Sequence, residues 1–160
     1  MNTKLKYIGI VTVIVLTLGL AQYAAARDLI VVATKATQES SKDWLGFLES
    51  KEIPVKLVTP DSFSDVKEEL YIFVLGSLDK SKEIAEIAKD ALTADEFNQV
   101  QNEAKMFYKP QAWNVGQKVI LILGPNQESV IKTRKDSRDE WYEMLMEWFD
   151  IEDSEGFHVY

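Results

Sequence analysis

The chain has 160 residues, a single histidine, no cysteine and a formal net charge of −8. Without cysteine, disulfides, a thiol nucleophile and thiolate metal sites are excluded, so the fold must rest on an ordinary hydrophobic core. The acidic balance also disfavours nucleic acid and anionic lipid surfaces as partners, because like charges repel.

Residues 1–26 have the pattern of an export segment. Two lysines precede an apolar run, and Ala24 and Ala26 form an A-x-A site after it, which is typical of a cleaved secretory signal peptide. The alternative is an uncleaved membrane anchor, since residues 7–26 would form about 30 Å of helix, enough to span a bilayer. Both readings predict an extracytoplasmic domain, secreted or anchored, whose only membrane contact is through residues 7–26 if they stay uncleaved. Cleavage would remove both lysines and take the charge from −8 to −10.

Apolar runs and helical patterns alternate along the rest of the chain. Continuous apolar runs are typical of strands buried on both faces. Four such runs cover Asp28–Thr34, Ile53–Pro60, Tyr71–Gly76 and Lys118–Leu123. The predicted helical segments are a helix capped by Thr37, a short turn at 61–70, two helices over about 80–104, and one long helix from about Gln127 to Phe149. Residues 105–117, rich in aromatic side chains, are predicted to be irregular.

This alternation predicts an α/β fold, because strands that alternate with helices form a mostly parallel sheet with helices on both faces. We expect a single domain over residues 27–149, built as a three-layer α/β/α sandwich. Its four-stranded, mostly parallel sheet is expected to have the flavodoxin-like order 2-1-3-4. Residues 150–160 are expected to form an acidic tail.

The predicted last helix has an unusual charge order. Four basic residues come first and four acidic residues follow: Lys132, Arg134, Lys135 and Arg138, then Glu140, Glu143, Glu147 and Asp150. The dipole of a single helix favours the reverse order, with acids early and bases late. We expect these charges to pair with an acidic partner surface or with the domain's own acids.

The glycine turn after the last predicted strand invites comparison with a phosphate-binding loop. After Gly124 the chain lacks the second glycine and the lysine of a Walker loop. Pro125 removes a backbone donor, and Glu128 places a negative charge in the first turn of the helix that follows. Asn126 fits the N-cap position of that helix. We therefore interpret this segment as a capped structural turn.

The sequence contains no recognisable catalytic set. Its one histidine is His158, near the end of the chain, and neither a G-x-S-x-G elbow nor an H-E-x-x-H pattern occurs. No catalytic residue, metal ion or cofactor is therefore predicted. A hydrolase with Asp79 and either Ser77 or Lys80 in acid–base roles is the weakest of the alternatives considered.

Polar residues at the expected carboxyl edge of the sheet form a candidate site for a small polar ligand. They are Thr34, Lys35, Ser77, Asp79 and Asn126. Open α/β sheets bind ligands at this edge, although these residue types are also ordinary turn and cap residues.

The aromatic-rich segment supplies a second candidate surface. Met106, Phe107, Tyr108 and Trp113 are too many large apolar residues for a solvated loop. They either pack over the edge of the sheet or form a patch for a partner. The leading expectation is a non-catalytic extracytoplasmic domain that contacts a protein or cell-envelope component, with a binder of small polar ligands as the alternative.

The stretch "KPQAWNVGQKVILILGPNQESVIKTRKDSRDEW" resembles uncharacterised archaeal secreted or membrane-anchored α/β domains. The resemblance covers about residues 71–149 and rests on a loose motif. A basic residue and a threonine often follow the glycine turn in that group, whereas Gln127 and Ser129 stand there in this chain. The resemblance implies an exported α/β domain and no particular activity.

Overall fold

The computed structural model describes residues 27–151. The predicted signal or anchor segment, 1–26, and residues 152–160 of the predicted tail lie outside the described part. Within residues 27–151, no helix combines the length and the apolar character needed to cross a membrane.

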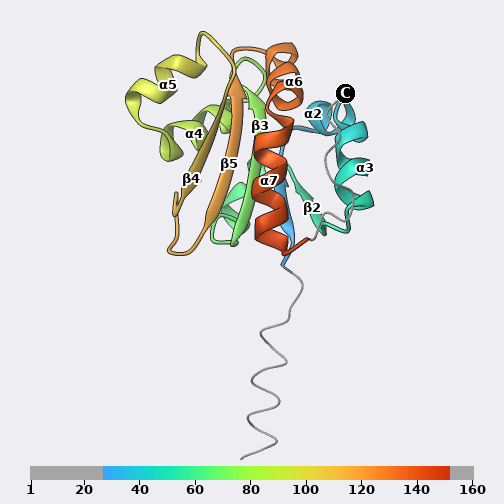
Figure 1. Ribbon diagram of the computed structural model, residues 1–160. Coiled ribbons are helices and arrows are strands. Elements are labelled where there is room, and N and C mark those ends of the chain that lie inside the picture. Colours follow the sequence, from blue (N-terminus) through green and yellow to red (C-terminus); the bar gives the residue numbers. More distant parts are fainter. Residues whose placement is uncertain (1–26, 152–160) are drawn as a thin grey trace, which may run out of the picture.

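The centre of the domain is a five-stranded mixed sheet in the order β2-β1-β3-β5-β4 (Figure 1). Its strands are β1 (Leu29–Val32), β2 (Val55–Val58), β3 (Tyr71–Ser77), β4 (Lys105–Pro110) and β5 (Lys118–Gly124). The four strands predicted from the sequence are parallel and keep the predicted order among themselves. The prediction of a four-stranded sheet is wrong, because β4 adds an antiparallel strand beside β5.

Strand β4 occupies part of the segment that the sequence predicts to be irregular. Its side chains alternate between the two faces of the sheet, so that Met106 packs against one core and Phe107 against the other. Both faces of the strand are therefore partly apolar. The polar–apolar alternation that usually reveals a half-buried strand is lost for this reason.

Helices cover both faces of the sheet, which gives three layers. The helical elements are α2 (Lys35–Glu39), α3 (Lys42–Ser50), η2 (Pro60–Asp65), α4 (Lys82–Ala91), α5 (Ala94–Val100), α6 (Gln127–Asp136) and α7 (Arg138–Phe149). Elements α3, α6 and α7 pack on one face, around the side chains of Leu29, Phe73 and Ile120. Elements η2, α4 and α5 pack on the opposite face, around Ile72 and Leu121.

The first helical segment divides into α2 and α3, and the predicted cap is displaced. Thr34, rather than Thr37, caps α2, because the Thr34 Oγ1 accepts a hydrogen bond from the Thr37 backbone N–H at 3.2 Å. Thr37 is buried, and its hydroxyl lies 2.9 Å from that of Thr34. At the start of α5, Thr93 and Glu96 form a capping box.

The predicted last helix is also two helices, because it breaks at Ser137. The Ser137 Oγ donates a hydrogen bond to the Thr133 carbonyl at 2.7 Å. The Arg134 carbonyl accepts a hydrogen bond from Trp141 Nε1 at 2.8 Å. Because of the break, Arg134 and Lys135 lie in the last turn of α6, and Asp139 lies in the first turn of α7, after Arg138. The helix dipoles favour Arg134, Lys135 and Asp139 at these positions, but they do not favour Arg138 at the start of α7.

Gly124 ends β5 at a point of close backbone approach. A Cβ atom there would lie 2.8 Å from the Ala104 Cα and 2.5 Å from its Cβ. Asn126 caps α6 by accepting a hydrogen bond from the Ser129 N–H at 2.9 Å. The interpretation of this segment as a capped structural turn is therefore confirmed, and close packing explains the glycine.

Candidate functional site

The carboxyl edge of the sheet brings together only part of the predicted ligand site. Thr34 and Lys35 line an open pocket of about 430 Å³ together with residues from η2 and the start of α4. Thr34 uses its hydroxyl to cap α2. The other lining residues are Thr59, Pro60, Asp61, Lys80, Ser81 and Glu83.

The other three predicted ligand residues lie outside that pocket. Ser77 is 3% exposed, and its hydroxyl has no hydrogen-bond partner among residues 27–151. Asp79 is exposed and forms a 3.6 Å ion pair with Lys80. Asn126 is used as the cap of α6. The pocket of about 430 Å³ is therefore lined by two of the five predicted residues, Thr34 and Lys35.

The four residues predicted to contact a partner are divided between the two faces of the sheet. Met106 packs against the core under α3 and α7, and Tyr108 lies over the Trp148 ring, with centroids 6.0 Å apart. Phe107 and Trp113 pack against the opposite core. Of the four, Tyr108 is the most exposed, at 41%. Whether any of them contacts a partner stays a prediction.

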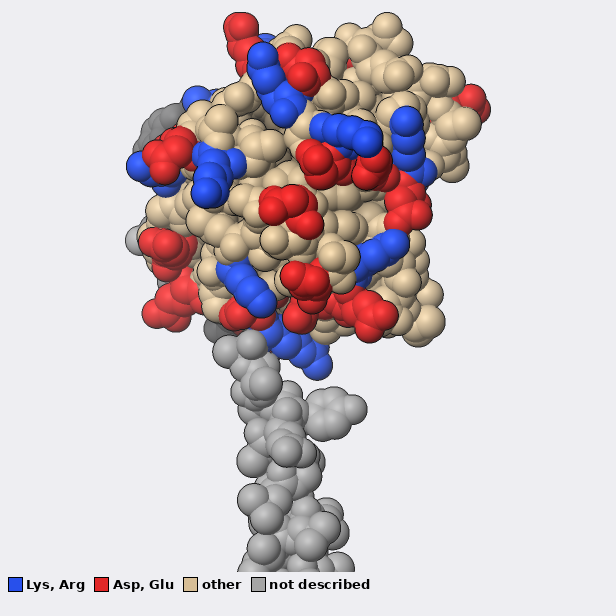
Figure 2. Space-filling model, turned by 180° about the vertical axis from the view of Figure 1, so that it is seen from behind, with Lys and Arg blue, Asp and Glu red and all other residues tan. Residues whose placement is uncertain are grey.

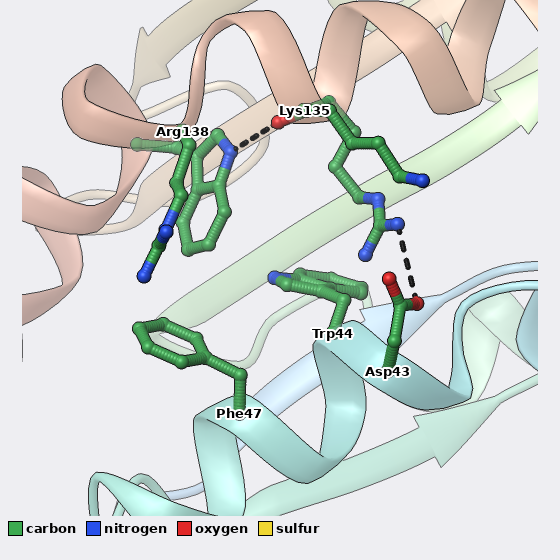
Figure 3. A pocket seen from close by; sticks show the side chains of 7 residues that line it. Asp43, Trp44, Phe47, Lys135 and Arg138 are labelled. Atoms are coloured by element: carbon green, nitrogen blue, oxygen red, sulfur yellow. Dashed lines mark hydrogen bonds and ion pairs between the residues drawn. The ribbon is translucent and has the colours of Figure 1, made fainter. Parts of the chain in front are cut away.

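A cleft between α3 and the α6–α7 junction has a chemical character that the sequence analysis missed. We call it the α3–α7 cleft; it has a volume of about 410 Å³ and is lined by Asp43, Trp44, Phe47, Arg134, Lys135, Arg138 and Trp141. Three aromatic rings and three cations therefore share one hollow with a single carboxylate. Figure 3 shows Trp44 and Phe47 rising from α3 toward Arg138 across the cleft.

The aromatic rings form the apolar walls of the cleft. Trp44 and Trp141 meet edge to face with centroids 5.9 Å apart and planes at 79°. Phe47 meets Trp141 at 78°, with centroids 6.4 Å apart. Edge-to-face contacts of this kind favour a fixed arrangement of rings. The two tryptophans are buried and Phe47 is half-buried, so the rings form a floor and one wall of the cleft.

Arg134 is the most unusual residue of the cleft. It is only 2% exposed, although arginine is almost never buried without full pairing. Its guanidinium lies 5.2 Å from the Trp44 ring and 3.5 Å from the Asp43 carboxylate. Its Nε has no hydrogen-bond partner among residues 27–151, and the same holds for the Trp44 Nε1. Two strong donors of the cleft are therefore unused.

Asp43 and Arg134 influence each other's pKa. Burial opposes ionisation of Asp43, but the Trp44 backbone N–H and the Arg134 cation outweigh it and lower the pKa of Asp43. Burial lowers the pKa of Arg134, and Asp43 opposes this effect. The guanidinium stays protonated at neutral pH because arginine starts from a very high pKa. Lys135 and Arg138 are exposed on the rim, with Arg138 4.7 Å from the Phe47 ring.

The opposite face of the molecule has a different charge pattern. Figure 2 shows acidic and basic side chains mixed over this face. A hollow of about 390 Å³ between η2 and α4 contains four carboxylates and one lysine: Asp61, Glu83, Glu86, Asp90 and Lys67. Lys67 is already paired with Asp90 at 2.6 Å. Single cation–ring contacts occur on this side too, as between Lys67 and the Trp113 ring at 6.0 Å, whereas the α3–α7 cleft has three cations and three rings in one hollow.

Within residues 27–151, no group of three or more His, Asp or Glu side chains could hold a metal ion. Of the residues named for a hydrolase, Ser77 is buried, and Asp79 forms a 3.6 Å ion pair with Lys80 on the surface; an acid–base role for them stays a prediction. His158 lies outside the described residues.

Comparison with known proteins adds no further assignment, because no family model, curated protein or solved structure matches the chain. The basic block at 132–138 was the available sequence signal for the cleft. Its pairing with aromatic rings of α3 depends on the break at Ser137 and on packing across some 90 positions of the chain, which composition does not reveal.

Proposed function

We propose that this protein is a non-catalytic, extracytoplasmic binding domain that holds a protein or cell-envelope partner through the α3–α7 cleft. The observation that carries the proposal is Arg134, a buried cation with an unused donor, which borders a hollow with aromatic walls. Leaving a charged donor without its full set of partners costs stability. A ligand that supplies the missing acceptor would recover that cost on binding.

Three further features support a ligand with a negative group on an apolar body. The rim cations Lys135 and Arg138 would attract the negative group, while the rings would cover the apolar part. The volume of about 410 Å³ lies in the range of small-ligand sites. The extracytoplasmic location is proposed from the N-terminal pattern of residues 1–26 alone, and the archaeal resemblance stays a prediction.

The proposal can be tested with phenylacetate, which combines one carboxylate with one ring. Titration of ¹⁵N-labelled protein is expected to shift the amide signals of residues 43–47 and 134–141 together. Phenylacetamide, which has the same shape without the charge, is the ligand control. Equal shifts with both compounds, or shifts elsewhere only, would contradict the proposal.

A pair of variants separates the cleft from a general charge effect. Arg138→Gln removes a rim cation and is expected to weaken phenylacetate binding by about fivefold, a typical loss for one partly exposed charge. Lys132→Gln removes the same charge from α6 outside the cleft, where Lys132 pairs with Asp136. This control is expected to bind phenylacetate within about twofold of the unchanged protein.

A further inference from the structure

The cleft contains one carboxylate, Asp43, among its three cations. This carboxylate limits which anions the cleft can bind. We infer that the α3–α7 cleft selects monoanionic carboxylates on an aromatic or branched apolar body, and that Asp43 is the residue that rejects dianions such as phosphate esters. The inference rests on the proposed function, because it concerns the same site.

The position of Asp43 makes it a competitor for the deepest cation. Its Oδ1 lies 3.5 Å from the Arg134 Nη2, and Figure 3 shows the Asp43 side chain pointing from α3 toward the opposite helix. The lowered pKa of Asp43 keeps it negative at neutral pH. A ligand anion drawn to Arg134 therefore approaches a fixed negative charge as well as a positive one.

The distribution of charge in the cleft, rather than its sum of +2, favours a single negative charge on the ligand. At the buried end the charge of Arg134 is offset by Asp43, while Lys135 and Arg138 are exposed on the rim. A second negative charge on a ligand gains attraction from the exposed rim, where water and salt weaken it. The same charge is repelled by Asp43 at short range and by a domain whose net charge is strongly negative.

The donors left unused also fit a carboxylate. The Trp44 Nε1 and the Arg134 Nε lack partners among the described residues, and both belong to rigid planar groups. A planar carboxylate with two acceptor oxygens can reach donors of this kind after a small shift of the rings, while its apolar body lies against Phe47 and Trp141. A tetrahedral phosphate would need more room and more donors.

The test compares phenylacetate with phenyl phosphate at pH 8, where the phosphate ester carries two charges because its second pKa is about 6. Dissociation constants are measured by tryptophan fluorescence, since Trp44 and Trp141 line the cleft. The unchanged protein is expected to prefer phenylacetate by about fivefold or more. Asp43→Asn is expected to shift this ratio toward phenyl phosphate by about fivefold, the effect of one nearby surface charge.

Two variants control for charge and position. Asp43→Glu keeps the charge and is expected to keep the preference for phenylacetate. Asp136→Asn removes an equal charge from α6 outside the cleft and is expected to change the ratio by less than about twofold. An unchanged ratio in Asp43→Asn, or a preference of the unchanged protein for phenyl phosphate, overturns the inference and leaves the proposed binding site standing. Binding of neither compound overturns the proposed function as well.

Two blocked dipeptides test whether the carboxylate belongs to a protein partner or to a small molecule. If the carboxylate belongs to a protein partner, acetyl-Phe-Glu-amide is expected to bind more tightly than acetyl-Phe-Gln-amide, with the same dependence on Asp43. If only phenylacetate binds, the ligand is a free small carboxylate. Each result supports the charge selection, and the pair distinguishes a peptide from a small molecule.

Discussion

Arg134 is a buried cation with incomplete pairing, and we expect it to reduce the stability of the fold. Its stem and guanidinium are buried against Trp44, yet its one ionic partner, Asp43, is weakly placed at 3.5 Å and largely exposed. Burial of a charge with incomplete pairing is unfavourable, and an apolar replacement of similar volume is often neutral or stabilising.

We therefore predict that Arg134→Met raises the free energy of unfolding by about 1 kcal/mol and abolishes phenylacetate binding. Methionine preserves the unbranched stem, so the packing against Trp44 is largely retained. Urea denaturation followed by far-ultraviolet circular dichroism measures the first effect, and fluorescence titration measures the second. A variant that is less stable and still binds would show that Arg134 has a structural role only.

Replacing Gly124 with even a small side chain is expected to lower the stability of the protein. Because the Ala104 backbone lies 2.8 Å from the position of an added Cβ, no side-chain rotation can relieve the contact. Gly124→Ala is expected to destabilise the protein by about 2 kcal/mol. Gly46→Ala is the matched control, since nothing lies within 4 Å of its added Cβ, and it is expected to stabilise α3 by about 0.5–1 kcal/mol. The midpoints of urea denaturation compare the two.

At the scale of elements, an ion pair between Glu96 and Lys109 joins α5 to β4. The Lys109 Nζ lies 2.5 and 2.6 Å from the two carboxylate oxygens of Glu96. Glu96 also closes the capping box with Thr93. The hydrogen bond from Lys109 and the Thr93 backbone N–H lower the pKa of Glu96. The ionised carboxylate therefore stabilises the fold.

The direction of this pKa shift gives a pH prediction. A lowered pKa contributes stability above the ordinary value of 4.5, and this contribution is lost as the pH falls below it through the folded-state pKa. Glu96→Gln is expected to cost about 1 kcal/mol at pH 7 and to flatten the loss of stability in acid. Glu103→Gln is the control, since Glu103 is exposed in its 3.6 Å pair with Lys105. Equal pH profiles for Glu96→Gln and the unchanged protein would contradict the prediction.

The helices illustrate what the sequence could and could not predict. The buried parallel strands and the caps at Asn126 and Thr93 follow from local patterns, because apolar runs and cap residues act within a few positions. The break at Ser137 was visible only as a charge order that a single helix does not favour, with bases before acids. Two shorter helices resolve part of this conflict, because Arg134 and Lys135 then lie at the end of α6 and Asp139 in the first turn of α7.

Strand β4 and the cleft could not be predicted for a different reason. Both depend on contacts between distant segments: β4 is fixed by its pairing with β5, and Arg134 meets Trp44 only after α3 and α6 have packed on the same face. The aromatic residues spread over 105–113 were expected either to pack together over the edge of the sheet or to form one patch. In a strand, successive side chains point to opposite faces, which divides such a group between two cores.

At the scale of the whole molecule, one hydrogen bond near the start of the domain concerns the predicted cleavage of the export segment. The Arg27 guanidinium donates a hydrogen bond to the Tyr71 hydroxyl at 3.3 Å, immediately after the predicted cleavage point. We predict that the exported protein begins at Arg27. N-terminal sequencing of protein recovered from outside the cytoplasm checks this, and an intact N-terminus in the membrane fraction would support the anchor instead.

The outer strands of the sheet also influence whether the protein aggregates at high concentration. Any exposed strand edge offers free backbone groups to a neighbouring chain, which can begin aggregation. At one edge, β4 carries Lys105 and Lys109 and ends at Pro110, which has no N–H to donate. At the other edge, β2 is only four residues long and contains Lys56. Charge, proline and shortness thus protect both edges, which is useful for a protein that has no disulfide to hold it together.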